Sequence, residues 1–143
     1  MTPRLKLAME QDGPSRGRHV REIVQQLLKL RSVRGALLVA PDGFVIAAEL
    51  REPVPLEPLA AMAARLGREL AASAARVGRA SFSTAMVSAD DGTVFVGAAP
   101  IGYVVVLADR QADLESTRRA VEEAVALIEA AWTAPLDGPP SVG

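Results

Sequence analysis

Few residues in this chain could carry out acid–base or covalent chemistry. His19 is the single histidine, and the chain contains no cysteine. A Ser-His-Asp or Cys-His catalytic group therefore has almost nothing from which to form. We expect His19 to be a solvated residue near the start of the first helix rather than a base or a metal ligand. The sequence predicts no catalytic residue.

Motifs for nucleotides and metals are also missing. No G-x-x-x-x-G-K-[ST] segment occurs, so the chain is not itself a P-loop GTPase. Asp90 and Asp91 precede Gly92, but a calcium loop needs about five or six ligands at set spacing, and a hairpin turn is the better interpretation. Arg118-Arg119 and Glu122-Glu123 are expected on the solvent side of the last helix, with ion pairs between residues four apart, such as Arg118 and Glu122. We predict neither a cofactor nor a metal.

Composition places the chain among ordinary globular domains. Its 143 residues are 50% hydrophobic and 23% charged, which suits one domain whose core needs no disulfide. No apolar run approaches the roughly 18 residues of a membrane span. The lack of cysteine suits the cytoplasm. A net charge of −1 and 3% aromatic residues give no reason to expect nucleic acid as a partner.

The elements that would position a site follow from apolar spacing and turn residues. Helices are expected over about 20–31, 56–79 and 112–132, with Gly35 soon ending the first. Strands are expected over 36–40, 44–50, 80–89, 93–99 and 102–108. The order is helix–strand–strand–helix–strand–strand–strand–helix. The folded domain should span 18–132, between a mobile arm over 1–17 and a disordered tail over 133–143.

Charge is divided unevenly between the two ends of the chain. Residues 1–34 carry a balance of +5 and residues 109–143 a balance of −4. Two interpretations remain open at this point. The first and last helices are either two separate solvated helices or two helices that lie side by side, where opposite charges cost least.

The strands differ in how well they are protected as sheet edges. Segments 36–40 and 103–108 are apolar on both faces and should be central. Segment 44–52 ends in charged residues and is followed by proline, as a protected edge is. Segment 80–89 has neither charge nor proline, so as an edge it would be undefended. Either another strand of this chain covers it, or a second copy pairs with it, which we favour. Its interface residues would be Phe82, Thr84 and Met86.

The middle helix has three faces rather than two. One is large and aliphatic, and comprises Leu59, Met62, Ala63, Leu66, Leu70 and Val77. The second is small, and comprises Ala60, Ala64, Gly67, Ala71, Ala75 and Gly78. Glycine within a helix costs about 1 kcal/mol relative to alanine, so a packing reason is expected. We favour close approach by another helix along this small face; the alternative is an alanine-rich composition without a role.

The third face of the middle helix is charged. It comprises Arg65, Arg68, Glu69, Arg76 and Arg79. Two middle helices side by side would present this face in duplicate. Arginine is favoured at protein interfaces because its planar guanidinium pairs with carboxylates through two hydrogen bonds. We predict a partner-binding surface here; the alternative is a face that only keeps the helix soluble.

Three stretches of the sequence resemble the Roadblock family, the dynein light chain type. They are RGALLVAPDGFVIA at 34–47, LAAMAARLG at 59–67, and GYVVVLAD at 102–109 followed by Asp113 and Leu114. Each is moderately specific, and the three in this order and spacing are a strong match. The resemblance covers about 20–130.

This resemblance implies a fold, an assembly and a function. Family members are α/β (α+β) proteins with a five-stranded antiparallel sheet, the middle helix on one face and the terminal helices on the other. They form homodimers by pairing the third strands, with the middle helices packed together. They bind and regulate Ras-like small GTPases, as bacterial gliding-polarity regulators do, or serve as dimeric adaptors. The resemblance implies a GTPase partner here, with a structural adaptor as the alternative.

Overall fold

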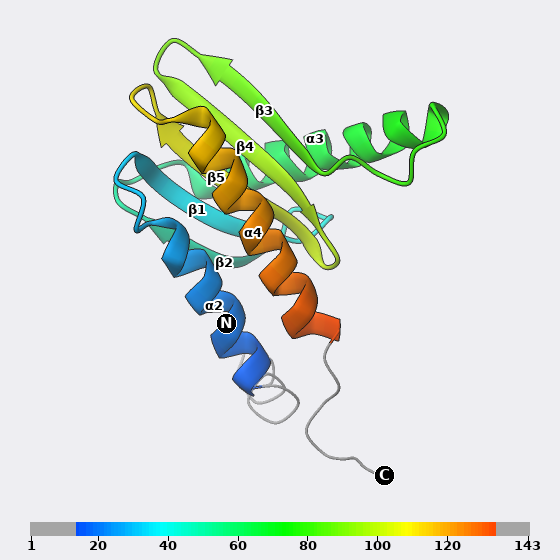
Figure 1. The fold of residues 1–143 in the computed structure, drawn as a ribbon, viewed down its shortest axis with the longest axis horizontal. Coiled ribbons are helices and arrows are strands. Elements are labelled where there is room, and N and C mark those ends of the chain that lie inside the picture. Colours follow the sequence, from blue (N-terminus) through cyan, green and yellow to red (C-terminus); the bar gives the residue numbers. More distant parts are fainter. Residues whose placement is uncertain (1–13, 134–143) are drawn as a thin grey trace.

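A five-stranded antiparallel sheet separates helix α3 from helices α2 and α4 (Figure 1). The computed structural model describes residues 14–133. In chain order the elements are α2 (Pro14–Leu27), β1 (Val33–Val39), β2 (Val45–Leu50), α3 (Leu56–Arg76), β3 (Thr84–Ala89), β4 (Gly92–Ala99), β5 (Gly102–Asp109) and α4 (Leu114–Thr133). The predicted order of elements and the α+β fold class are confirmed.

The strand order in the sheet is β2-β1-β5-β4-β3. The central position of β1 and β5 is as predicted, because both bury apolar residues on their two faces. Successive residues serve two cores: Leu38 packs with α2 and α4, whereas Leu37 packs with α3. Both predicted edges, β2 and β3, are edges of the sheet.

The beginning of the domain differs from the prediction. Helix α2 begins at Pro14, so residues 14–17 of the predicted arm are its first turn. Proline is favoured at this position because its ring presets the helical φ and its missing N–H would have no partner there. Residues 1–13 and 134–143, the rest of the predicted arm and tail, lie outside the described residues.

Gly35 does not end a helix. It lies within β1, and a Cβ atom there would be 2.8 Å from Leu50 Cδ2 on the neighbouring strand. Helix α2 ends earlier, at Leu27, and turns over residues 28–32 lead into β1. A side chain at residue 35 would therefore have to displace the Leu50 side chain of β2.

Helices α2 and α4 lie side by side on one face of the sheet (Figure 1). This decides between the two interpretations of the uneven charge in favour of neighbouring helices. None of the ion pairs within residues 17–133 joins α2 to α4. The two helices are held by apolar contacts, with Val24 and Ile128 fully buried in the same core. No helix within the described residues is long and apolar enough to cross a membrane.

Candidate protein-interaction site

The outer edge of β3 is a row of backbone groups that no described strand covers. Thr84 lies opposite Gly97, and the N–H of Ala98 donates to the carbonyl of Ser83 at 2.9 Å. In an antiparallel ladder this makes Thr84 and Gly97 a pair without mutual hydrogen bonds. The N–H and C=O groups of alternate residues, beginning at Thr84, therefore point away from β4. They form a template to which another strand could bind.

Both faces of β3 expose apolar side chains beside this row. Met86 lies opposite Phe95 and so shares its face with α2 and α4. Val87 lies opposite Val94 and shares its face with α3. Met86 is 46% exposed and Val87 is 51% exposed. An edge that combines unpaired backbone with apolar side chains on both faces favours association over solvation.

The first half of α3 lies directly on its own sheet. Ala60 and Ala64 are buried there, and a Cβ atom on Gly67 would lie 2.5 Å from the Tyr103 ring. The packing reason expected for Gly67 therefore exists, but the neighbour is β5 of the same chain. The prediction that these three residues line a seam with the helix of a second copy is corrected, because they have no surface left to offer one.

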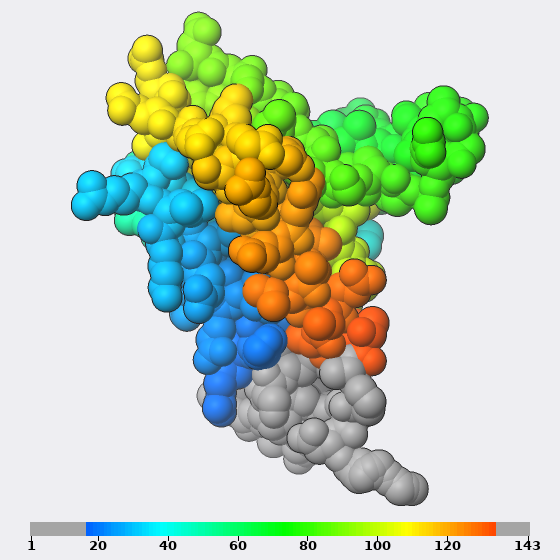
Figure 2. Space-filling model, in the orientation of Figure 1, coloured from blue at the N-terminus to red at the C-terminus, as the bar shows by residue number. Residues whose placement is uncertain are grey.

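The second half of α3 projects beyond the sheet, as the green lobe of Figures 1 and 2 shows. Ala71 is only half-buried, and no residue from 68 to 76 is buried. Gly78 lies outside the helix with φ +83°, where the N–H of Arg79 donates to Ala74 O at 2.8 Å. This left-handed glycine ends the helix. Gly78 is thus a helix terminator rather than part of a packing face.

The aliphatic face of α3 includes exposed side chains that the sequence analysis had not assigned to an interaction surface. Met62 is 46% exposed and Val77 is 74% exposed. Together with Val87, they were missed as candidates for the site. The available signal was that α3 is apolar on two faces, which together form a wider surface than contact with one sheet covers.

Phe82 and Thr84 lie at the border between core and surface. The Phe82 ring stacks on Tyr103, with centroids 6.3 Å apart. Thr84 Oγ1 is buried and has no hydrogen-bond partner among the described residues. Phe82 therefore helps to hold the segment that leads from α3 into β3.

The residues of the charged face of α3 make different contacts. Arg65 pairs with Glu69 at 3.5 Å, and both side chains are largely exposed. Arg76 donates to Ser73 Oγ at 3.1 Å. Arg68 instead donates to the carbonyl of Pro41 in the turn between β1 and β2. Arg79 is exposed in the segment after the helix. Arg65, Glu69 and Arg76 thus remain available to a partner, whereas Arg68 holds the β1–β2 turn.

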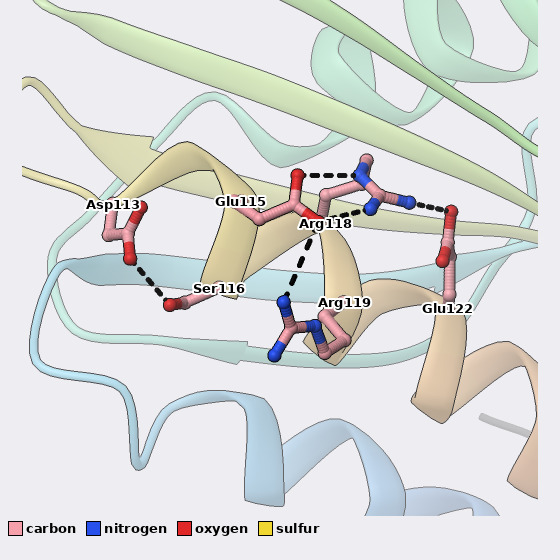
Figure 3. A network of polar contacts seen from close by, with 6 residues as sticks. All are labelled: Asp113, Glu115, Ser116, Arg118, Arg119 and Glu122. Carbon is pink, nitrogen blue, oxygen red and sulfur yellow. Dashed lines mark hydrogen bonds and ion pairs between the residues drawn. The ribbon is translucent and has the colours of Figure 1, made fainter.

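A second charged cluster lies on α4, on the opposite side of the sheet (Figure 3). Arg118 bridges Glu115 and Glu122, the latter at 2.6 Å, which confirms the predicted pairing of Arg118 with Glu122. The hydrogen bond from Arg118 lowers the pKa of Glu115, and the hydrogen bond from Ser116 lowers the pKa of Asp113. These contacts stay within α4 and support its first turns.

Within residues 17–133, no three His, Cys, Asp or Glu side chains come together as metal ligands would. His19 is exposed on α2, as predicted. The arrangement is suited to protein contact, through the β3 edge and the exposed faces of α3.

Comparison with known proteins supports the same fold. The Roadblock/LC7 domain model matches residues 19–108, which is more than half of the chain. No curated protein sequence matches it. The gliding protein MglB of Thermus thermophilus is similar in structure, with 23% identity, a TM-score of 0.73 and coverage of 81% of this chain and 90% of that one.

Two further solved structures are similar. Myxococcus xanthus MglB is 15% identical, with a TM-score of 0.75 and coverage of 81% and 89% of the two chains. A structure described as MglB with a tetrameric arrangement is 25% identical, with a TM-score of 0.68 and coverage of 81% and 92%. On the family match and the sheet with its three helices, the chain belongs to the Roadblock/LC7 domain family.

Proposed function

We propose that the chain is a non-catalytic, homodimeric regulatory module that binds a Ras-like small GTPase and modulates its nucleotide state. The observation that carries the proposal is the outer edge of β3, with its outward backbone groups and the exposed Met86 and Val87. Such an edge is rarely left open in a soluble protein. The Roadblock resemblance supplies the class of partner.

The dimer would form by antiparallel pairing of the two β3 strands into one ten-stranded sheet. Each Thr84 N–H would then donate to the other copy, and Val87 and its copy would continue one apolar surface. The projecting half of each α3 would lie beside the other α3, which would cover Val77. The similar structure with a tetrameric arrangement supports self-association.

The GTPase would bind the outer faces of the paired α3 helices. Arg65, Glu69 and Arg76 would be presented there in duplicate, and Arg79 at the end of each helix. Arginine pairs well with carboxylates of a partner surface because its guanidinium offers two parallel donors. We propose a cytoplasmic location and no nucleic acid as a partner.

The experiment compares two matched charge reversals, Arg65→Glu and Arg119→Glu. The side chain of Arg65 is 76% exposed and that of Arg119 is 73% exposed, and each pairs with a glutamate four residues away. Only Arg65 lies on α3. The purified chain is titrated with each Ras-like GTPase of its own organism, loaded with GDP or a non-hydrolysable GTP analogue. Arg65→Glu should weaken binding several-fold through slower association, and Arg119→Glu should not.

The possible outcomes test the GTPase partner and its binding surface separately. If the wild type binds no Ras-like GTPase in either nucleotide state, the regulatory function is wrong and a structural adaptor remains. If the wild type binds and Arg65→Glu binds equally well, the GTPase contacts another surface. Added salt should weaken the wild-type complex more than the Arg65→Glu complex.

A further inference from the structure

An open groove runs along the junction of α2 and α4, on the face of the sheet opposite α3. Its volume is about 490 Å³. Ile23, Leu27 and Leu127 are among the apolar side chains that line it. Ile23 and Leu27 are buried, but Leu127 is 47% exposed. In Figure 2 the blue surface of α2 and the orange surface of α4 meet on this face. The groove therefore offers uncovered apolar surface away from the proposed dimer edge.

The rim of this groove carries two carboxylates, Glu22 on α2 and Glu123 on α4. Neither forms an ion pair within residues 17–133. His19, Gln26 and Lys29 are the other polar residues of the rim. An apolar floor between two unpaired carboxylates suits a segment that has apolar side chains on one side and basic side chains on the other.

The chain itself contains such a segment four residues before α2. Residues 4–9 read Arg-Leu-Lys-Leu-Ala-Met. In an extended conformation, successive side chains point to opposite sides. Leu5, Leu7 and Met9 would then form an apolar side, and Arg4 and Lys6 would point the other way. Asp12 and Gly13, which follow, are a residue pair typical of turns.

The lengths of groove and segment agree. From His19 to Leu27, α2 rises about 12 Å at about 1.5 Å per residue. From Leu5 to Met9, an extended segment covers about 13 Å at about 3.3 Å per residue. A reversal of direction at Asp12 and Gly13, just before Pro14, would bring the segment back along α2.

We propose that the groove between α2 and α4 binds residues 4–9 of the same chain. Leu5, Leu7 and Met9 lie against the apolar floor and cover Leu127. Arg4 and Lys6 lie on the outward side of the segment, from which their long side chains reach the rim and neutralise Glu22 and Glu123. The inference is independent of the proposed GTPase partner, because both halves of the contact belong to this chain.

Disulfide trapping tests the proposal, and the natural chain has no cysteine to interfere. The full chain carries Leu7→Cys together with either Leu127→Cys or, as a control, Met62→Cys. Leu127 is 47% exposed and Met62 is 46% exposed, on opposite faces of the sheet. Oxidised glutathione accepts the electrons of the two thiols. We expect the disulfide with Leu127→Cys to form within one chain at least tenfold faster than that with Met62→Cys.

Mass spectrometry and non-reducing gels distinguish the outcomes. Equal rates for the two pairs, or no disulfide with Leu127→Cys, would overturn the proposal. A disulfide between two chains would also overturn it and would assign the groove to a second copy. In the variant with Leu7→Cys and Leu127→Cys, adding both Glu22→Gln and Glu123→Gln should slow disulfide formation at least threefold at low salt. An unchanged rate would contradict the charge contact.

Discussion

At the residue scale, Arg118 forms ion pairs with two glutamates near the start of α4. It holds Glu115 three residues before it and Glu122 four residues after it (Figure 3). The hydrogen bond to Glu115 raises the pKa of Arg118 and lowers the pKa of Glu115. The folded chain therefore favours the charged forms of both groups. These side chains are in contact with solvent, so the contribution to stability is small and sensitive to salt.

The lowered pKa of Glu115 predicts a stability effect that depends on pH. A carboxyl group whose pKa is lower in the folded state stabilises the fold above its unfolded pKa, about 4.3 for glutamate. This stability is lost as pH falls through the folded pKa. Glu115→Gln should therefore lower the urea midpoint at pH 7, and the difference from wild type should shrink as the pH falls below about 4.3. Glu129→Gln on the same helix is the control; a difference for Glu115→Gln that persists in acid would contradict the assignment.

At the element scale, the position of α3 depends on what lies beneath Gly67. The Tyr103 ring occupies the space that a Cβ would need, at 2.5 Å. Stacking with Phe82, at 6.3 Å between centroids, limits how far the ring can move away. The contact fixes how closely α3 approaches β5. It thereby sets where the exposed residues of α3 lie relative to the β3 edge.

Gly67→Ala should have opposite effects in two backgrounds. In the wild type, the new methyl group overpacks against Tyr103, and the free energy of unfolding should fall by about 1–2 kcal/mol. In a Tyr103→Leu background, the higher helix propensity of alanine should raise it by up to about 1 kcal/mol. Urea unfolding of the wild type, Gly67→Ala, Tyr103→Leu and the double variant measures the change in unfolding free energy in both backgrounds. A loss of equal size in both backgrounds would show that Tyr103 is not the reason for the glycine.

At the scale of the whole molecule, the proposed assembly depends on one strand edge. The backbone N–H of Thr84 points away from β4, so the monomer does not use it in the sheet. A proline is tolerated at such an outward position of an edge strand. The same substitution removes a donor that a second β3 strand would need.

Thr84→Pro should therefore separate the dimer and leave the sheet intact. Light scattering at micromolar concentration should give a mass near twice 15.0 kDa for the wild type and near 15.0 kDa for the variant. Thr84→Val keeps the N–H and is the matched control, and it should remain a dimer. Circular dichroism checks that the variant is folded. A wild-type monomer, or a Thr84→Pro dimer, would rule out assembly through this edge.

Local patterns in the sequence were enough to predict most of the elements. The continuous apolar runs in β1 and β5, the turn glycines and the uncharged segment before Asp90 predicted the element order and both sheet edges. The spacing of four residues predicted the pairing of Arg118 with Glu122. Each of these properties depends on residues close together in the chain, and spacing reports them directly. Helix limits were less accurate, as at Pro14 and Arg76, because the ends of a helix depend on individual caps.

The tertiary structure alone decided which side of α3 is buried. Two of its faces are apolar, and the sequence by itself determined that both exist, but not which residues of each face meet the sheet. The choice depends on Tyr103, which is distant in the chain and fills the space beside Gly67. Ala60, Ala64 and Gly67 of the small face therefore pack inward together with Ala63, Leu59 and Leu66 of the aliphatic face, whereas Met62 and Val77 are exposed. Burial is a property of contacts across the whole fold, so no pattern within one helix could have assigned it.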